Sequence, residues 1–279
     1  MTTRTTPKLI DGSARWRSIS TRGTHTCGIR EDNTLWCWGY NGFGGLGNNT
    51  VVNQLMPTQV AGGVGQLGNG TLIGQTTPVR YMTSTAGVSS VGVGRDHTCT
   101  LAGSKVECAG FNVYGELGNN TTTSNPIPQP VGGAFTRVAV GGDHACTTTA
   151  DNKAWCWGYN ASGQLGLDDN VRRLTPQAIT SAQPWSKLSA GAEHTCGIQL
   201  DGALWCWGNN VRGQLGDGTF LNRAAPVRIG NGTTWANVSA GTSHTCAVET
   251  AGALWCWGTN DNGEIPDGTS WRSYFVAIP

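Results

Sequence analysis

One segment of about fifteen residues occurs five times along the chain, and this repeat limits the fold more than any other feature. Each copy has a histidine, a cysteine two residues later, and a second cysteine nine or ten residues after the first. The histidines are residues 25, 97, 144, 194 and 244, so the period is about 50 residues apart from a first interval of 72. The copies are THTCGIREDNTLWCWG (24–39), DHTCTLAGSKVECAG (96–110), DHACTTTADNKAWCWG (143–158), EHTCGIQLDGALWCWG (193–208) and SHTCAVETAGALWCWG (243–258).

The long first interval contains a partial duplication. The segments GLGNNTVVNQLMP (45–57) and QLGNGTLIGQTTP (66–78) align at an offset of 21 residues. Removing this offset restores a nearly regular period. We therefore interpret residues 61–82 as an insertion that copied a turn and an outer strand without the cysteine hairpin.

Each repeat contains four short stretches with the pattern of strands. The cysteine hairpin supplies two, an apolar pair after a proline supplies the third, and the segment leading into Ser-Ala-Gly supplies the fourth. Glycine provides 42 of the 279 residues and charged residues only 13%, as expected for short strands and tight turns. Four-stranded units repeated at this length predict an all-β fold, a single β-propeller of about five four-stranded blades over 1–279. The predicted units are 12–60, 83–131, 132–179, 180–229 and 230–279.

The repeat resembles a known family. The pattern W…SAGxxHTC…DGxLWCWGxNxxGQLGDGT…PVxI is similar to the repeat of the regulator-of-chromosome-condensation family, in a cysteine-bearing form like those of many uncharacterised bacterial proteins. The resemblance extends from about Pro7 to Ile278. It implies a propeller, usually of seven blades. By analogy it also implies nucleotide exchange on a small GTPase and chromatin binding.

Hairpin geometry predicts a disulfide in every blade. If Cys196 lies opposite Cys206, the loop has three residues and ends at Gly202, a residue type that tolerates positive φ. In the second unit the cysteines are nine apart, and a two-residue loop, Gly103-Ser104, keeps them opposed. Opposed residues on antiparallel strands lie within disulfide range. The predicted pairs are Cys27–Cys37, Cys99–Cys108, Cys146–Cys156, Cys196–Cys206 and Cys246–Cys256.

A metal site and a redox pair are the alternatives for the same residues. His194, Cys196 and Cys206 would converge from two strands as three zinc ligands, but the motif lacks a fourth ligand. The spacing is also not that of a CxxC redox pair. We therefore expect no metal and no cofactor, and we interpret the histidines as buried polar residues that hydrogen-bond to a neighbouring strand.

The tryptophans of the hairpin are expected to pack between blades. Alternation places Trp205 and Trp207 on the face opposite Cys206. An aromatic stripe that binds sugars is the alternative. The second unit departs from the pattern, because Glu107 and Ala109 replace the two tryptophans.

The second unit, which departs from the repeat, comes directly after the duplicated insertion in the sequence. This arrangement suggests a functional role for the region. We hypothesise that residues 61–82 pack near the second blade or make it a contact surface. The candidate contact residues are Leu67, Leu72, Ile73, Tyr81, Met82 and Glu107.

Catalytic motifs are absent from the sequence. The repeat accounts for all five histidines, and neither GxSxG nor HExxH occurs. The acids of two turns, Asp217 and the pair Asp168 and Asp169, are interpreted as turn residues, with a Ca²⁺ site as the alternative. We expect no enzymatic activity.

Charge and hydropathy restrict the partners. The net charge of +1 provides no basic surface for nucleic acid, and no apolar run is long enough to span a bilayer. The first ten residues lack the apolar core of a signal peptide, so we expect a removed leader or another route to the compartment. Disulfides point to a secreted or cell-surface protein.

Glycosylation sequons and the chain ends complete the expectations. Copies of the outer strand occur at residues 7–10 and 274–278, one more than five hairpins need, and the surplus strand would close the ring or pair with a neighbouring molecule. Sequons begin at Asn48, Asn69, Asn119, Asn120, Asn160, Asn231 and Asn237.

Together these features predict a non-enzymatic extracellular propeller that acts through protein–protein contacts, either with a protein partner or by self-assembly into a surface or filamentous structure. A monomeric binding module for a protein or glycan is the alternative. The exchange-factor or chromatin function that the family resemblance implies ranks below both, because five disulfides do not suit a reducing compartment.

Overall fold

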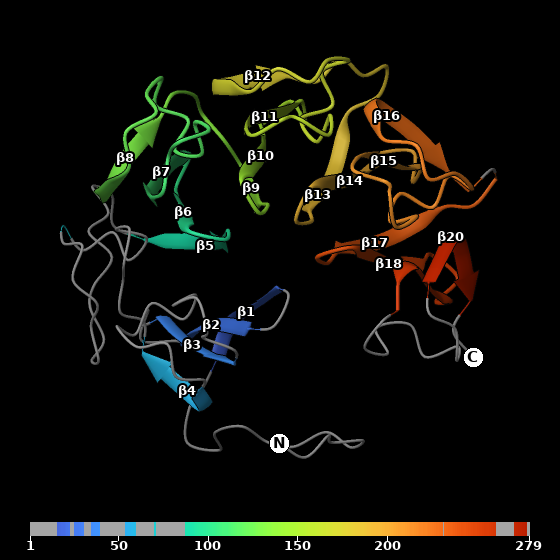
Figure 1. The fold of residues 1–279 in the computed structure, drawn as a ribbon, viewed down its shortest axis with the longest axis horizontal. Helices are drawn as coiled ribbons and strands as arrows, with labels where there is room; N and C mark the ends of the chain where they lie inside the picture. The colour runs from blue at the N-terminus through green and yellow to red at the C-terminus, as the bar shows by residue number, and fades with distance from the viewer. Residues whose placement is uncertain are drawn as a thin grey trace.

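The described residues form five four-stranded antiparallel sheets in the computed structural model (Figure 1). The structure describes residues 87–230 and 232–260 with their side chains, together with Gly70. It also describes the backbone of five strand segments at 16–22, 25–30, 35–39, 54–59 and 271–277. All regular elements among these residues are strands, which confirms the predicted all-β propeller class.

Each sheet is a simple meander of four consecutive strands. The first contains β1 (Trp16–Arg22), β2 (His25–Arg30), β3 (Leu35–Gly39) and β4 (Gln54–Gln59). The second contains β5 (Val88–Val93), β6 (His97–Ala102), β7 (Lys105–Gly110) and β8 (Asn125–Val131). The third contains β9 (Arg137–Val140), β10 (His144–Thr148), β11 (Ala154–Gly158) and β12 (Arg173–Ala178). The fourth contains β13 (Trp185–Ala190), β14 (His194–Gln199), β15 (Leu204–Gly208) and β16 (Arg223–Ile229). The fifth contains β17 (Trp235–Ala240), β18 (His244–Glu249), β19 (Leu254–Thr259) and β20 (Trp271–Ala277).

The sheets are arranged as blades around a central space. The first strand of each sheet, β1, β5, β9, β13 or β17, lies nearest this space, and the fourth strand lies at the periphery (Figure 1). The C-terminal copy of the outer strand is β20, which pairs with β19 inside the fifth sheet. The N-terminal copy at 7–10 lies outside the described residues, as does the 61–82 insertion except for Gly70.

The central hairpin of each blade has the predicted register. Cys196 pairs with Cys206, and the tip closes with a hydrogen bond from Gln199 N–H to the carbonyl of Ala203, leaving a three-residue loop. Gly202 at the end of that loop has φ +82°, as expected. The second blade pairs Ala102 with Lys105 and so has the shorter two-residue loop.

Four of the five predicted disulfides are confirmed, each with Cα atoms 4.1 Å apart. Cys27 and Cys37 are opposed in the register of β2 and β3, and their side chains lie outside the described residues. The confirmed pairs are Cys99–Cys108, Cys146–Cys156, Cys196–Cys206 and Cys246–Cys256. The disulfides also exclude zinc binding by these eight cysteines, because their thiolates are consumed.

The hydrophobic core is divided into clusters, each made by the disulfide of one blade and the aromatic residues of the next. Around Cys146–Cys156 of the third blade, the cluster includes Trp185 and Trp207 of the fourth blade. Trp207 is fully buried, and its ring centroid lies 5.4 Å from that of Trp185. The predicted packing of tryptophans between blades is therefore confirmed.

A chain of buried hydrogen bonds fixes each blade against its neighbour. His144 Nε2 lies 2.8 Å from the hydroxyl oxygen of Thr195 in the next blade. That hydroxyl donates to the carbonyl of Gln164 at 2.9 Å, and the indole N–H of Trp207 donates to the same carbonyl at 3.0 Å. Gly166 lies directly beside the indole: its φ is +71°, and a Cβ there would be 2.8 Å from Nε1 of Trp207.

The same network recurs at the junction of the fourth and fifth blades. His194 contacts Thr245 at 2.9 Å, and both Thr245 and Trp257 donate to the carbonyl of Gln214. At the junction of the second and third blades, Ala145 takes the place of the threonine, while Trp157 still donates to the carbonyl of Glu116. The histidine prediction is confirmed for His144 and His194, with the partner strand in the adjacent blade.

The disulfides should contribute strongly to stability. Replacing Cys196 and Cys206 together by Ala is expected to lower the free energy of unfolding by about 2–3 kcal/mol, because the bridge restricts the unfolded chain. Urea unfolding followed by tryptophan fluorescence measures this change. A reductant that left the midpoint of the unmodified chain unaltered would contradict the prediction.

The inter-blade network predicts an asymmetric effect of two substitutions at Thr195. Thr195→Ala should cost about 1–3 kcal/mol, because it removes the hydroxyl that pairs with His144 Nε2 and one of the two donors to the buried carbonyl of Gln164. Thr195→Ser retains the hydroxyl and should cost clearly less. Equal losses for the two variants in urea unfolding would show that packing of the methyl group, and not the hydrogen bonds, matters here.

Candidate functional site

Three long loops join the third strand to the fourth strand in the second, third and fourth blades. They span residues 111–124, 159–172 and 209–222. Each loop is organised by one fully buried asparagine. In the third of them, Asn210 Oδ1 accepts from Leu215 N–H, and its amide donates to Asp217 and to the carbonyl of Thr219. The loops are thus held from inside by side-chain hydrogen bonds.

Asp217 acts as a turn residue. Its Oδ1 accepts from Asn210 and from the N–H and hydroxyl of Thr219, and its Oδ2 accepts from Arg223 at 2.8 Å. Burial alone would raise the pKa of Asp217, but the hydrogen bonds from Thr219 and Arg223 outweigh it, so the pKa is lowered. Both carboxylate oxygens of Asp217 thus accept hydrogen bonds from nearby residues of the same chain, which agrees with its interpretation as a turn residue.

The loops are joined side by side into one surface. Arg172 of the third blade donates to the carbonyl of Val113 in the second at 3.1 Å. Glu193 accepts hydrogen bonds from Ser162 and Asn209, which belong to neighbouring loops. Arg95 and Asp143 form an ion pair of 2.9 Å between the second and third blades.

Exposed apolar side chains are concentrated on these loops. Because the strands alternate in direction, all three loops emerge at the same end of the propeller. Five of the eight large apolar residues described as exposed lie on them, at 41–64% exposure. We call this set the loop face; it comprises Val113, Val171, Val211, Phe220 and Leu221.

The loop face was not predicted from the sequence. Val113 and Val211 occupy equivalent repeat positions, as do Val171 and Leu221, so the available signal was an apolar residue recurring in a polar turn. An apolar residue in a turn indicates an interaction surface only when its exposure is known. Single exposed apolar side chains are common on protein surfaces, whereas groups of them are unusual.

The predicted contact surface on the second blade is only partly described. Leu67, Leu72, Ile73, Tyr81 and Met82 lie outside the described residues. Gly70 N–H donates to the carbonyl of Pro126 at 3.1 Å, so one residue of the insertion touches outer strand β8 of that blade. Glu107 is only 4% exposed and is therefore not available to another molecule in the folded chain, which corrects its assignment as a contact residue.

The sequons differ in accessibility. Asn160 is fully buried, and its amide nitrogen donates to Asp169 and Val171, so a glycan on this nitrogen is incompatible with the fold. This corrects the expectation for that sequon. Asn48, Asn69 and Asn231 lie outside the described residues, and glycosylation of Asn119, Asn120 and Asn237 stays a prediction.

Glu116 is an unusual buried acid next to the loop face. It stands where the next two blades have Gln164 and Gln214, and each of the three side chains accepts the backbone N–H two residues earlier. One carboxyl oxygen of Glu116, Oε1, is buried without a hydrogen-bond partner. Burial, and to a smaller extent the charge of Asp143, raise the pKa of Glu116 to about 7.

The described residues contain neither a metal-binding group of three or more His, Cys, Asp and Glu side chains nor a helix able to cross a membrane. The described residues define a propeller cross-linked by disulfides, with exposed apolar side chains on the loop face. Two models of the regulator of chromosome condensation (RCC1) repeat match the chain. One matches residues 108–147, 151–198 and 201–248, and the other matches 17–44, 135–164, 185–214 and 235–264. These matches together cover more than half of the chain, which belongs to the RCC1 repeat family.

Similar proteins support the fold assignment. The ultraviolet-B receptor UVR8 of Arabidopsis thaliana is 28% identical over 169 residues, which are 58% of this chain and 33% of the receptor. The chain thus spans about a third of the length of that curated relative. Prp20p of Saccharomyces cerevisiae, a structure described with its binding to Gsp1p and histones, has a TM-score of 0.75 at 21% identity. The aligned region covers 95% of this chain and 77% of Prp20p. Human WBSCR16 has a TM-score of 0.74 at 20% identity, covering 95% of this chain and 67% of that structure.

Glu116 predicts a pH-dependent stability. Its folded pKa exceeds the ordinary value, so ionisation of this carboxyl destabilises the fold: the contribution of Glu116 to stability is greatest below about pH 4.5 and falls until about pH 7. The total loss should be up to about 3 kcal/mol. Glu116→Gln should remove this dependence and be the more stable form at pH 8.

Urea unfolding at a series of pH values tests the effect, and the chain provides a reciprocal control. Gln164→Glu places a carboxyl in the equivalent turn of the third blade and should introduce a similar decline in stability. Parallel pH profiles for the unmodified chain and Glu116→Gln would rule out Glu116 as the source.

Proposed function

We propose that this chain is a non-enzymatic protein-binding propeller that works in an extracellular or cell-surface setting and contacts its partner through the loop face. The observation that carries the proposal is the group of five exposed apolar side chains on adjacent loops. Exposed apolar groups on a soluble protein mark interaction sites.

The rigidity of the loops supports a binding role. Their backbones are held by Asn112, Asn160 and Asn210, which are fully buried. A partner that binds a preformed surface pays little entropy for ordering it. Apolar side chains on such loops are therefore suited to act as anchors.

The disulfides support the proposed compartment. Four bridges occur in the described part of the chain, and persistent disulfides are typical of oxidising environments. Secretion or surface display would provide that environment. A nuclear exchange factor would work in a reducing one.

The relatives support a protein partner. Yeast RCC1 (Prp20) has been crystallised with Kap60 bound, and Prp20p is described with binding to Gsp1p and histones. We extend to this chain only the class of partner, another protein. Self-assembly, the second candidate, would use a surplus outer strand. The C-terminal copy is engaged in the fifth sheet as β20, so the surplus copy is the one at 7–10, which lies outside the described residues.

A double substitution on the loop face tests the proposal. Phe220→Thr with Leu221→Thr introduces the residues that the second blade carries at the equivalent positions, Thr122 and Thr123. Both side chains are exposed, so stability should change by less than about 0.5 kcal/mol per site. Binding of the partner should fall at least about tenfold, because apolar anchors dominate interface energies.

The measurement is crosslinking capture from the extracellular protein fraction of the source cells, quantified by mass spectrometry and followed by affinity measurement on the captured protein. A matched control, Leu200→Thr with Leu254→Thr, removes exposed leucines at the opposite end of the blades. The proposal is wrong if both double variants retain the same partner, or if the control alone loses it. Concentration-dependent oligomers in light scattering, abolished by the loop-face variant, would instead assign this face to self-association.

A further inference from the structure

A ring of equivalent positions surrounds the central space where the innermost strands begin. Ser90, Arg137, Lys187 and Asn237 occupy these positions in four successive blades. Each pairs with the residue that lies four positions after the repeat histidine of its blade. The ring therefore contains two cations where the flanking blades have a serine and an asparagine.

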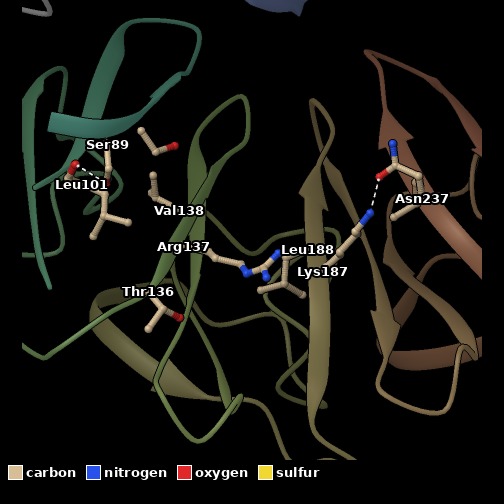
Figure 2. A pocket seen from close by; sticks show the side chains of 10 residues that line it. Ser89, Leu101, Thr136, Arg137, Val138, Lys187, Leu188 and Asn237 are labelled. Atoms are coloured by element: carbon tan, nitrogen blue, oxygen red, sulfur yellow. Dashed lines mark hydrogen bonds between the residues drawn. The ribbon is translucent and has the colours of Figure 1, made fainter. Parts of the chain in front are cut away.

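These four residues line a single pocket of about 420 Å³ (Figure 2). Its walls are formed by β5, β6, β9, β13 and β17; Arg137 extends from β9 toward β13, and Lys187 extends from β13 toward Asn237 of β17. The lining residues are Ser89, Ser90, Leu101, Thr136, Arg137, Val138, Lys187, Leu188, Asn237 and Val238.

The cations of the pocket retain hydrogen-bonding capacity. Lys187 Nζ donates to the carbonyl of Ala236 at 2.7 Å and to Oδ1 of Asn237 at 3.2 Å, which uses two of its three N–H groups. Both acceptors are neutral. Arg137 is exposed and forms no ion pair with any acid of the described part of the chain.

The electrostatics of the pocket favour a negatively charged occupant. No Asp or Glu is among the ten lining residues. A negatively charged group beside the exposed guanidinium of Arg137 would form charge-assisted hydrogen bonds, and the positive charge of Lys187 adds to the attraction. Guanidinium and ammonium groups are the usual donors to carboxylates and phosphates.

We propose that this pocket binds a small organic anion, in which a carboxylate or phosphate is attached to an apolar group. The oxyanion contacts the guanidinium of Arg137, and the ammonium group of Lys187 adds positive charge to the same pocket. The apolar group packs against the aliphatic side chains Val138 and Leu188.

Size and position support this type of ligand. A volume of about 420 Å³ lies in the range of small-molecule sites, which combine apolar walls with a few polar groups. The pocket lies at the beginning of β5, β9, β13 and β17, the end of the antiparallel blades opposite the loop face. The site is therefore independent of the protein contact proposed above.

Calorimetric titration of the full chain with phenyl phosphate and with benzoate tests the proposal. At least one of these probes should bind saturably at one site, with a Kd of about 1 mM or tighter, and the tighter one identifies the preferred oxyanion. Benzyl alcohol, which lacks the charge, should not bind. Arg137→Ser and Lys187→Asn copy the residues of the flanking blades. Arg137→Ser should weaken binding at least about tenfold, and Lys187→Asn, which removes a charge without a direct contact, should weaken it by a smaller factor.

Arg228→Ser is the matched control, since it removes one exposed cation from outer strand β16 and should leave the affinity unchanged. Thermal unfolding verifies that all three variants are folded. Absence of saturable binding by both anions would overturn the proposal, as would unchanged affinity in Arg137→Ser and Lys187→Asn. An equal loss in Arg228→Ser would also overturn it, because binding would then depend on net charge alone.

Discussion

The contact between the disulfide face of one blade and the tryptophans of the next is the interaction on which the fold depends. A four-stranded sheet cannot bury both of its faces alone, so every blade relies on its neighbours. The disulfide lies in the middle of one face, and the indole of Trp207 lies against the cluster around Cys146–Cys156. The indole N–H also donates to the carbonyl of Gln164, which joins the apolar contact to a directional one. Burial and hydrogen bonding thus specify the same relative position of the two blades.

Much of this architecture could be predicted from the sequence, because it depends on spacing within one hairpin. The pairing of Cys196 with Cys206 and the positive φ of Gly202 follow from loop length and residue type. The partners across blades could not be predicted in the same way. The acceptor for Trp207 and Thr195 is a backbone carbonyl, and the identity of a residue does not reveal where its carbonyl points. The cationic ring was missed for a related reason: Arg137 and Lys187 are 50 residues apart, and each is an ordinary polar residue within its own strand.

Departures from the repeat are concentrated around the second blade. Glu107 and Ala109 replace tryptophans, Ala145 in the next blade replaces the threonine of the network, and Glu116 replaces the glutamine. The changes at the tryptophans and the threonine remove side chains that the later blades use between blades, and the buried carboxyl of Glu116 introduces a group whose pKa burial raises to about 7. The hydrogen bond from Gly70 to Pro126 places part of the insertion against the same blade. The second blade thus combines the least regular packing with the only described contact of the duplicated segment.

The disulfides and the inter-blade hydrogen bonds also explain why the two ends of the propeller can carry different kinds of side chains. The Cys, Trp, His and Thr residues that build the contacts within and between blades recur with little change. Residues at the strand ends are free of that constraint, so one end carries Val211, Phe220 and Leu221 on preformed loops, and the other carries Arg137 and Lys187 around the axis. An apolar surface suits a macromolecular partner, and a cationic recess suits a small anion. Because each blade is cross-linked by its own disulfide and packed against its neighbours, a ligand at one end would alter the other end only by changing how the blades meet.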